Sequence, residues 1–469
     1  MVFSSMVFSA LFLPVTFLLY FATKNPKIRN AVLLTVSLLF YAWGEPKWIF
    51  VMLLTVTVNY FCGLLIDSSE SKFRRTVCMV TGVALSLGFL FYFKYFGFFS
   101  DIIMGLLGRE NPFTKPVLPI GISFYTFQVL TYTVDVYRRK VSVQKNYAQL
   151  LMYVCFFPQL IAGPIVNYTD IAPSLGKRNI ETNDVYEGFM RFFIGFAKKV
   201  LLANTCGIIT DKLLAGSAMS VAGSWLMAVS YAFQIYFDFS GYSDMAIGMG
   251  RIFGFRFFEN FNYPYISKSV TEFWRRWHIS LGTFFRDYVY IPLGGNRVST
   301  LLHIRNIMIV WLLTGFWHGA SWNFLVWGLY YGVLLLAEKF LLRRIKEKLP
   351  DAVNIAVTLV LVLIGWVFFY FENLGDGLRH LSIMFGLSGA ELIDPAAIYY
   401  FKHYLLFLVA SALASIPWKQ VFGKLPEAAG TPLRTIGAWL KPVVVSALFL
   451  ASLAMIITQS YNPFLYFRF

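Results

Sequence analysis

The sequence predicts an all-α protein that crosses a membrane many times, and three observations lead to this prediction. Hydrophobic residues make up 58% of the 469 residues and charged residues only 14%, against roughly a quarter in soluble domains. The apolar segments extend almost from end to end, which indicates one membrane domain over residues 1–469. The basic residues behind the formal net charge of +16 gather in short loops between apolar runs. That pattern is typical of helices oriented by cytoplasmic positive charge and in contact with membrane lipid, so we expect no nucleic acid partner.

A spanning helix needs about 20 mainly apolar residues. About eleven or twelve spans are expected from twelve apolar segments, several of which are short: Met6–Ala22, Asn30–Trp43, Trp48–Ile66, Thr76–Phe99, Gln149–Val166, Tyr186–Cys206, Ser224–Tyr236, Ile307–Trp322, Phe324–Leu342, Val353–Phe371, His403–Ile416 and Pro442–Thr458. Met1–Ala22 has no basic leader and no small-residue cleavage site, so we expect a retained helix rather than a cleaved signal peptide.

Two further stretches are predicted to be re-entrant. Pro116–Val136 begins with two prolines and a glycine, and Thr271–Gly295 carries several charges and His278 among aromatic residues. Charges and broken backbone at membrane depth are tolerated only inside the protein or beside a water-filled cavity, so Thr271–Gly295 should line a funnel and not face lipid. The alternative for this stretch is an amphipathic helix on the membrane surface.

His318 is the first candidate for chemistry, because it lies within the predicted membrane region, in the segment Thr314–Asn323. A neutral imidazole can take a proton from a hydroxyl and return it later. At helical spacing Thr314, His318 and Trp322 would share one face, and Gly315 and Gly319 would allow close approach of a helix or ligand. The alternative is a histidine hydrogen-bonded between packed helices.

Other polar groups are less informative by themselves. His278 adjoins Arg275 and Arg276, which disfavour its charged form, and by itself it favours an interfacial histidine in an amphipathic segment. Asp238 begins a polar run to Asp244 that needs buried partners and is typical of a scaffold.

Several site classes are missing from the sequence. The four cysteines form no Cys-x-x-Cys pair, so neither a metal site nor a disulfide framework is expected. There is no G-x-S-x-G elbow, Walker loop, dinucleotide fingerprint or His-x-x-x-His pair. A serine hydrolase, a nucleotide-driven pump and a dinucleotide enzyme therefore lose support.

Six motifs in order along the chain resemble the membrane-bound O-acyltransferase family, in particular its bacterial alginate O-acetylation-type branch. They are Leu118–Tyr125, Phe157–Pro164, Asp238–Asp244, Phe273–His278, Gly315–Asn323 and Tyr461–Phe469. The resemblance implies helices around a central funnel or tunnel, with His318 in the place of the family's invariant histidine and His278 in that of its usual partner. It also implies that the donor or tunnel is contacted by Trp274, Arg275, Arg276, Trp317, Trp322, Asn323 and Asp238.

The resemblance further implies the reactants and the setting. No cofactor is expected to stay bound; the donor is a thioester, acetyl-CoA in this branch, that is reached from the cytoplasm of a bacterium through its inner membrane. The acceptor is a hydroxyl of an extracytoplasmic polysaccharide, served by an extracytoplasmic partner of the SGNH or serine-esterase-like acetyltransferase type. The alternatives from other classes are a transporter of lipid-linked sugar or polysaccharide, and a scaffold of an export complex.

The aromatic segment 459–469 suggests a relay. The phenol of Tyr466 could accept the acyl group as a transient ester and pass it to the partner enzyme. An interfacial aromatic anchor, with Arg468 at the lipid headgroups, is the alternative.

Overall fold

The computed structural model describes residues 2–161, 163–176, 178–216, 219–418, 430–459 and 461–465, with the backbone alone for 430–438. Helices dominate these ranges and no strand occurs in them, which confirms the all-α prediction. The chain divides into two compact units: unit 1 is Met1–Phe192 with Ser243–Phe258, and unit 2 is Phe193–Tyr242 with Glu259–Phe469. A single membrane domain over residues 1–469 stays a prediction.

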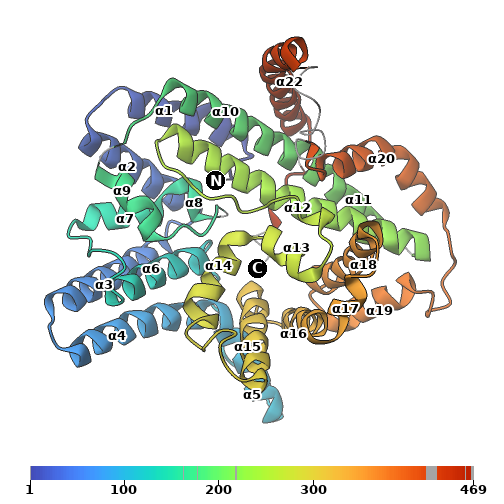
Figure 1. Ribbon diagram of the computed structural model, residues 1–469, viewed down its shortest axis with the longest axis horizontal. Helices are drawn as coiled ribbons and strands as arrows, with labels where there is room; N and C mark the ends of the chain where they lie inside the picture. Colours follow the sequence, from blue (N-terminus) through green and yellow to red (C-terminus); the bar gives the residue numbers. More distant parts are fainter. Residues whose placement is uncertain are drawn as a thin grey trace. The chain divides into compact units, whose positions relative to one another are not determined.

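Unit 1 is a succession of apolar helices, of which α3 and α4 lie side by side (Figure 1). Asn25 and Ser71 start two of these helices by accepting hydrogen bonds from the backbone N–H groups of Lys27 and Arg74. The elements are η1 (Phe8–Phe12), α1 (Leu13–Phe21), α2 (Pro26–Gly44), α3 (Ile49–Ser68), α4 (Lys72–Leu90), η2 (Phe91–Tyr95), α5 (Phe96–Leu106), α6 (Ile122–Tyr137), α7 (Tyr147–Cys155), α8 (Phe157–Leu160), α9 (Tyr168–Gly176) and the first part of α10 (Thr182–Ala197).

Unit 2 packs its helices around a core rich in aromatic rings, which includes Trp277, Trp327, Tyr331, Trp366 and Phe369. Its elements are η3 (Lys198–Ala203), α11 (Asn204–Leu214), most of α12 (Val221–Ile252), η4 (Pro264–Ile266), α13 (Val270–Arg276), α14 (Ile279–Phe285), η5 (Arg286–Tyr290), α15 (Thr300–His318), α16 (Trp322–Ala337), η6 (Glu338–Leu342), α17 (Arg343–Lys346), α18 (Asp351–Tyr370), α19 (Leu374–Met384), α20 (Pro395–Ala414) and α22 (Gly430–Thr458).

The described chain contains eight helical segments that are long and apolar enough to cross a membrane, so the protein is a multi-pass membrane protein. They are Ile49–Ser68, Lys72–Leu106, Thr182–Leu214, Thr300–His318, Trp322–Lys346, Asp351–Tyr370, Pro395–Ala414 and Trp439–Thr458. Each overlaps a predicted span. The predicted number of about eleven or twelve is not confirmed.

The predicted span Gln149–Val166 is wrong. The segment folds as α7 and the four-residue α8, separated by Phe156, whose φ of −53° and ψ of 110° are not helical. Pro158 lies at the start of α8 and Pro164 beyond its end, and proline cannot supply the N–H that a continuing helix needs. This apolar segment is therefore buried and broken into two short helices, and it does not form one spanning helix.

The stretch Pro116–Val136 leads into α6, a helix of 16 residues that is buried on nearly all sides. It begins after Gly121, whose φ is +76° and where an added Cβ would lie 2.9 Å from the carbonyl oxygen of Leu160. Polar side chains such as Gln128 and Thr131 are fully enclosed on α6. A short helix that is buried all round lies inside the protein; its re-entrant placement stays a prediction.

Candidate active site

His318 is the last residue of α15, and a tight pairing of α15 with α16 brings it inward. Gly319 ends the helix in extended backbone, and α16 starts at Trp322. An added Cβ on Gly315 would lie 3.2 Å from the Cα of Gly328, so the two helices meet backbone to backbone. Gly319 likewise has no room for a Cβ beside the ring of Phe324.

His318 is 6% exposed, and its imidazole lies among aromatic rings. Its ring centre is 5.0 Å from that of Phe369 and 5.1 Å from that of Trp327. It borders a cavity of about 20 Å³, which we call the His318 cavity, lined by Ile235, Asp238, Phe239, Trp277, His318, Trp327, Trp366, Phe369 and Leu465. That volume admits little more than one water molecule.

His278 lies at a break between α13 and α14, in the left-handed region with φ +45° and ψ +54°. This backbone conformation is costly for any residue with a Cβ, so the surrounding contacts must hold it. The backbone N–H of Ile279 donates to the Asn260 carbonyl oxygen over 3.0 Å, and the Asn260 side chain accepts from the backbone N–H of Ser280 over 3.1 Å. The stretch Thr271–Gly295 therefore holds α13 and, after a bend, α14 continuing into η5, which disfavours one continuous surface helix.

The contact with Asn260 also defines the tautomer of His278. Because Asn260 Oδ1 accepts from the backbone N–H of Ser280, it must be the amide oxygen. His278 Nδ1, 3.2 Å from that oxygen, then carries the proton and donates it. Nε2 keeps its lone pair, is buried, and has no hydrogen-bond partner among the described residues. Burial lowers the pKa of His278 to about 3, so the ring stays neutral near pH 7.

The two histidines border neighbouring cavities. His278 lines a second cavity of about 200 Å³, the His278 cavity, with Trp274, Trp277, Leu281, Gly282, Phe285, Arg286, Tyr290, Val310, Trp311 and Thr314. Trp277 belongs to the walls of both cavities. The ring of Trp317, the residue before His318, is 6.0 Å from that of His278.

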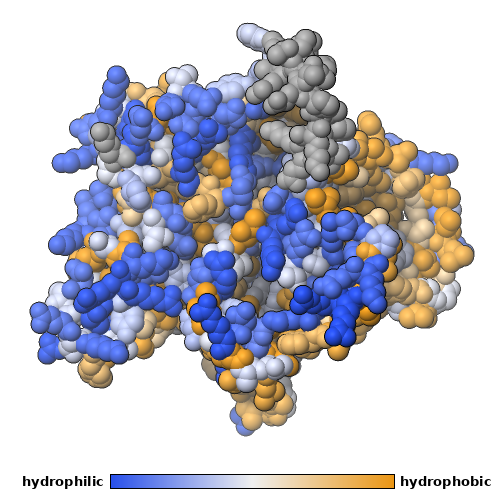
Figure 2. Space-filling model, in the orientation of Figure 1, coloured by the Kyte–Doolittle hydropathy of each residue, from blue (hydrophilic) through white to orange (hydrophobic). Residues whose placement is uncertain are grey.

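A larger, basic pocket of about 740 Å³ adjoins the His278 cavity and shares Tyr290, Val310 and Trp311 with it. Five basic residues line this pocket, Lys268, Arg275, Lys339, Arg343 and Lys346, against the three acids Glu338, Glu347 and Asp351. Figure 2 shows hydrophilic residues gathered over α13 and α17, from which Arg275, Arg343 and Lys346 come.

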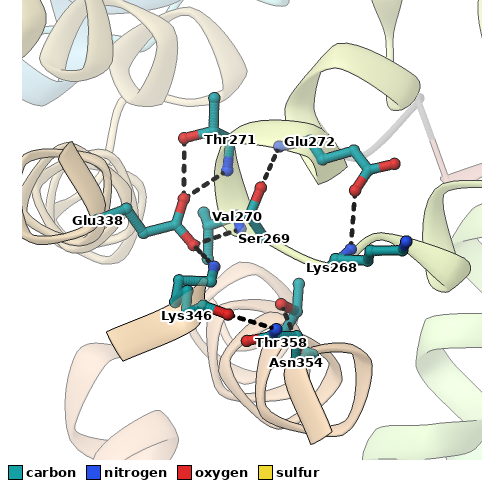
Figure 3. Close-up of polar contacts among 9 residues, drawn as sticks. All are labelled: Lys268, Ser269, Val270, Thr271, Glu272, Glu338, Lys346, Asn354 and Thr358. Atoms are coloured by element: carbon teal, nitrogen blue, oxygen red, sulfur yellow. Dashed lines mark hydrogen bonds and ion pairs between the residues drawn. The ribbon is translucent and has the colours of Figure 1, made fainter. Parts of the chain in front are cut away.

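A carboxylate of η6 joins α13 to α17 at this pocket (Figure 3). Glu338 accepts from the backbone N–H groups of Val270 and Thr271, over 2.7 and 2.9 Å, and from Lys346. Ser269 caps the same helix by accepting from the backbone N–H of Glu272. These bonds satisfy N–H groups at the start of α13 and hold Trp274 and Arg275 toward the cavities.

The other predicted contact residues fall into two groups. Trp274, Arg275 and Asp238 line the cavities, and Trp317 packs between the two histidines. The structure does not bring Arg276, Asn323 or Trp322 into the cavity walls. Arg276 pairs with Glu272 over 2.8 Å. Asn323 donates its amide N–H groups to the carbonyl oxygens of Phe368 and Phe371, so it ties α16 to the end of α18.

The expected shared face of Thr314, His318 and Trp322 is wrong. The helix ends at His318, so helical spacing does not continue to Trp322, which is 58% exposed. Tyr466 lies outside the described residues. Sequence reasoning missed Asn260 and Lys199; the signal for Lys199 was a cation within the predicted span Tyr186–Cys206.

Comparison with known proteins supplies a family match. The model of the membrane-bound O-acyltransferase family matches residues 136–373, a range that contains both histidines. The chain is 39% identical to a probable alginate O-acetylase of Pseudomonas putida, over the whole of both chains. It is 34% identical to a peptidoglycan O-acetyltransferase of Helicobacter pylori, over 84% of this chain and 81% of the relative. A teichoic acid D-alanyltransferase of Bacillus subtilis is 30% identical over 52% of this chain and 65% of its own.

Proposed function

The chain belongs to the membrane-bound O-acyltransferase family and is a multi-pass acyltransferase, and from this premise we propose that it carries acetyl groups across a bacterial inner membrane for O-acetylation of a polysaccharide. The donor is a cytoplasmic thioester, acetyl-CoA, and the final transfer to sugar is made by an extracytoplasmic serine-esterase-like partner. The names of the relatives favour an acyltransferase over the transporter and the export scaffold.

The observation that carries the proposal is the pair of buried histidines on neighbouring cavities. The basic pocket lies beside one of these, the His278 cavity. Three cations of that pocket, Lys268, Arg343 and Lys346, pair with its acids, which leaves Arg275 and Lys339 to complement the phosphates of coenzyme A. The His278 cavity, lined mainly by aromatic and aliphatic side chains, suits the arm that carries the thioester. The acetyl carbonyl would then reach His318 through the wall that the two cavities share at Trp277.

His318 is the proposed general base. Its imidazole takes the proton of the acceptor hydroxyl as the oxygen attacks the thioester carbonyl. The tetrahedral intermediate collapses to the ester, the C–S bond breaks, and the imidazolium returns the proton to the leaving thiolate, so that free thiol and neutral His318 result. A fixed position of both reactants in such a site contributes on the order of 7–11 kcal/mol.

His278 has a different proposed role. With Nδ1–H donated to Asn260, its Nε2 can only accept a hydrogen bond while the ring is neutral. This disfavours a role in donating to the oxyanion. We propose instead that Nε2 accepts from an amide N–H of the donor's arm and so orients the thioester.

The relay at Tyr466 remains part of the proposal. Leu465, the residue before it in the sequence, lines the His318 cavity, which supports an acceptor hydroxyl close to the base. Transfer to the phenol would be followed by transfer to the partner enzyme. If wild-type protein and Tyr466→Phe load acetyl equally, by intact mass after incubation with acetyl-CoA, the relay is excluded.

The main test is His318→Ala in lipid nanodiscs with acetyl-CoA and the partner enzyme. Release of coenzyme A thiol should fall by about 10²–10⁴-fold, the usual contribution of a general base. His403→Ala is the matched control, because His403 is exposed on α20 and lines none of the three cavities described above. Thiol release at the wild-type rate by folded His318→Ala would refute the assignment.

A further inference from the structure

Lys199 is a buried cation in an unusual turn. It lies in η3, a π-helical turn within the long helical segment Thr182–Leu214, and is 1% exposed. Three oxygen atoms lie around its ammonium group: Asp238 Oδ1 in an ion pair at 2.8 Å, Asn204 Oδ1 in a hydrogen bond at 2.7 Å, and the carbonyl oxygen of Pro463. π-Helical turns of this kind often occur at functional sites.

Asp238, the partner of Lys199, is 2% exposed on α12. Its second oxygen, Oδ2, accepts the backbone N–H of Leu465 over 3.0 Å. Each member of the ion pair therefore binds the backbone of one short segment, Tyr461–Leu465, which we call the clamped segment. The cation takes a carbonyl and the carboxylate takes an N–H group.

Further contacts hold the clamped segment along its length. The hydroxyl of Tyr461 donates to Asp211 Oδ2 over 2.7 Å, and Asn204 donates to the Tyr461 carbonyl oxygen over 3.3 Å. The ring of Phe464 lies 4.0 Å from that of Tyr242, between centres. The segment is thus built into unit 2 by polar and aromatic contacts.

A fully buried ion pair is a poor source of stability, because desolvation offsets the attraction and an apolar pair of similar volume often does as well. In a membrane protein such a pair is a functional candidate by default. Here Asp238 and Leu465 both line the His318 cavity. The charges therefore hold a wall of the proposed reaction site in one position.

We propose that Lys199 and Asp238 form a clamp that fixes the segment Tyr461–Leu465 as a wall of the His318 cavity, and that both are positioning residues for acyl transfer. The inference rests on the proposed function for its link to catalysis. The clamp itself is a separate, measurable property.

Two variants separate a clamp from a simple stabilising pair. Lys199→Met removes the cation. The double exchange Lys199→Asp with Asp238→Lys keeps opposite charges together but reverses their places. It sets an acid against the carbonyl of Pro463 and a cation against the N–H of Leu465, so neither backbone bond can form. Lys115→Met is the control, since it breaks the exposed ion pair between Lys115 and Asp101 in unit 1.

The first readout is hydrogen–deuterium exchange of the peptide that covers 461–465, measured by mass spectrometry in nanodiscs. Exchange in this peptide should quicken by about tenfold or more in Lys199→Met and in the double exchange, the equivalent of one lost bond to a charged group. The control should exchange like the wild type. If Lys199→Met does not fold, the double exchange decides. Wild-type exchange in the folded double-exchange variant would overturn the clamp.

The second readout is the rate of acetyl transfer with the partner enzyme. Both clamp variants should transfer more slowly than the wild type and than Lys115→Met. Wild-type transfer rates in both folded clamp variants would refute a positioning role in catalysis. If His318→Ala transfers normally while the exchange results hold, the proposed function fails and the clamp stands. If His318→Ala is inactive while hydrogen exchange in the clamp variants matches the wild type, the proposed function stands and the clamp fails.

Discussion

Asn260→Asp is expected to give His278 a titration that the wild-type enzyme lacks near neutral pH. The carboxylate would lie about 3.2 Å from Nδ1, the present separation of His278 Nδ1 and Asn260 Oδ1. At an effective dielectric constant of about 20, this attraction is about 5 kcal/mol, or between three and four pKa units. Added to the wild-type pKa of about 3, it brings the pKa of His278 to about 6.5 or 7.

The sign of the effect on activity follows from the tautomer. Protonated His278 carries a hydrogen on Nε2 and can no longer accept a bond from the donor. The ratio of variant to wild-type activity should therefore fall as the pH drops through about 7, approaching tenfold for each unit below. Protonation of the proposed base His318 lowers both activities and leaves this ratio unchanged. Arg286 also faces the His278 cavity, but its pairing with Asp287 over 2.7 Å limits its influence on the ring.

The assay is kcat/KM for acetyl-CoA between about pH 5 and 9, with thermal stability followed at each pH. Asn262→Asp is the control, because it adds the same charge two residues away on an exposed side chain. If folded Asn260→Asp and Asn262→Asp have the same pH profile as the wild type, Asn260 does not govern the protonation of His278 and the argument for its acceptor role is wrong.

Three further predictions concern the cavities and their supports. Arg275→Ala should raise the KM for acetyl-CoA by about tenfold or more with a smaller change in kcat, since a charge-assisted bond to phosphate is worth about 1.5–3 kcal/mol. Arg276→Ala, the control, should mainly lower thermal stability. Equal KM values in the two variants would refute phosphate binding at Arg275. Gly328→Ala should destabilise the protein by about 1–3 kcal/mol, because its Cβ would overlap the carbonyl of Trp311, and an unchanged midpoint of thermal unfolding would contradict this. Leu465→Ala should raise the rate with propionyl-CoA relative to that with acetyl-CoA by about tenfold, the usual effect of one methylene in a pocket. Leu408→Ala, in a separate core cluster, should leave this ratio unchanged. Equal ratios in the two variants would show that Leu465 does not limit the size of the acyl group.

The spans with long apolar runs were predictable because lipid requires every backbone group to be bonded within its own helix. The run Trp48–Ile66, for example, became α3 with similar ends. Gln149–Val166 is also apolar, yet its helix breaks at Phe156. Hydropathy does not show this break, because it does not record that proline lacks the backbone N–H of a helix hydrogen bond. Composition therefore predicted membrane helices well and failed where the backbone turns inside the protein.

The site was predictable only in part, for a similar reason. His318 could be identified as an ionisable group in an apolar run. The helical face that it was predicted to share with Trp322 does not exist, because α15 ends at His318 and Gly319 is extended. Asp238 was singled out without its partner, because Lys199 and the backbone of Pro463 reach it only through tertiary packing. Local patterns identify candidate charges, whereas their pairing across hundreds of residues requires the fold.

The small volume of the His318 cavity has a consequence for the chemistry. A space of about 20 Å³ holds roughly one water molecule, so an acetyl carbonyl and an attacking oxygen fit beside the imidazole only if a wall moves. Most of the walls come from α12, α15, α16 and α18, where any shift strains helix backbone bonds and the packing of large rings. Leu465 lies instead in the clamped segment, which is held by side-chain bonds from Lys199, Asp238, Asn204 and Asp211 and not by helix backbone bonds. It is therefore the wall that moves at the lowest cost. The same clamp would then limit two opposing rates. A weaker clamp admits the acyl group more easily but also admits water to the activated thioester, so the ratio of transfer to hydrolysis should fall as the clamp is loosened.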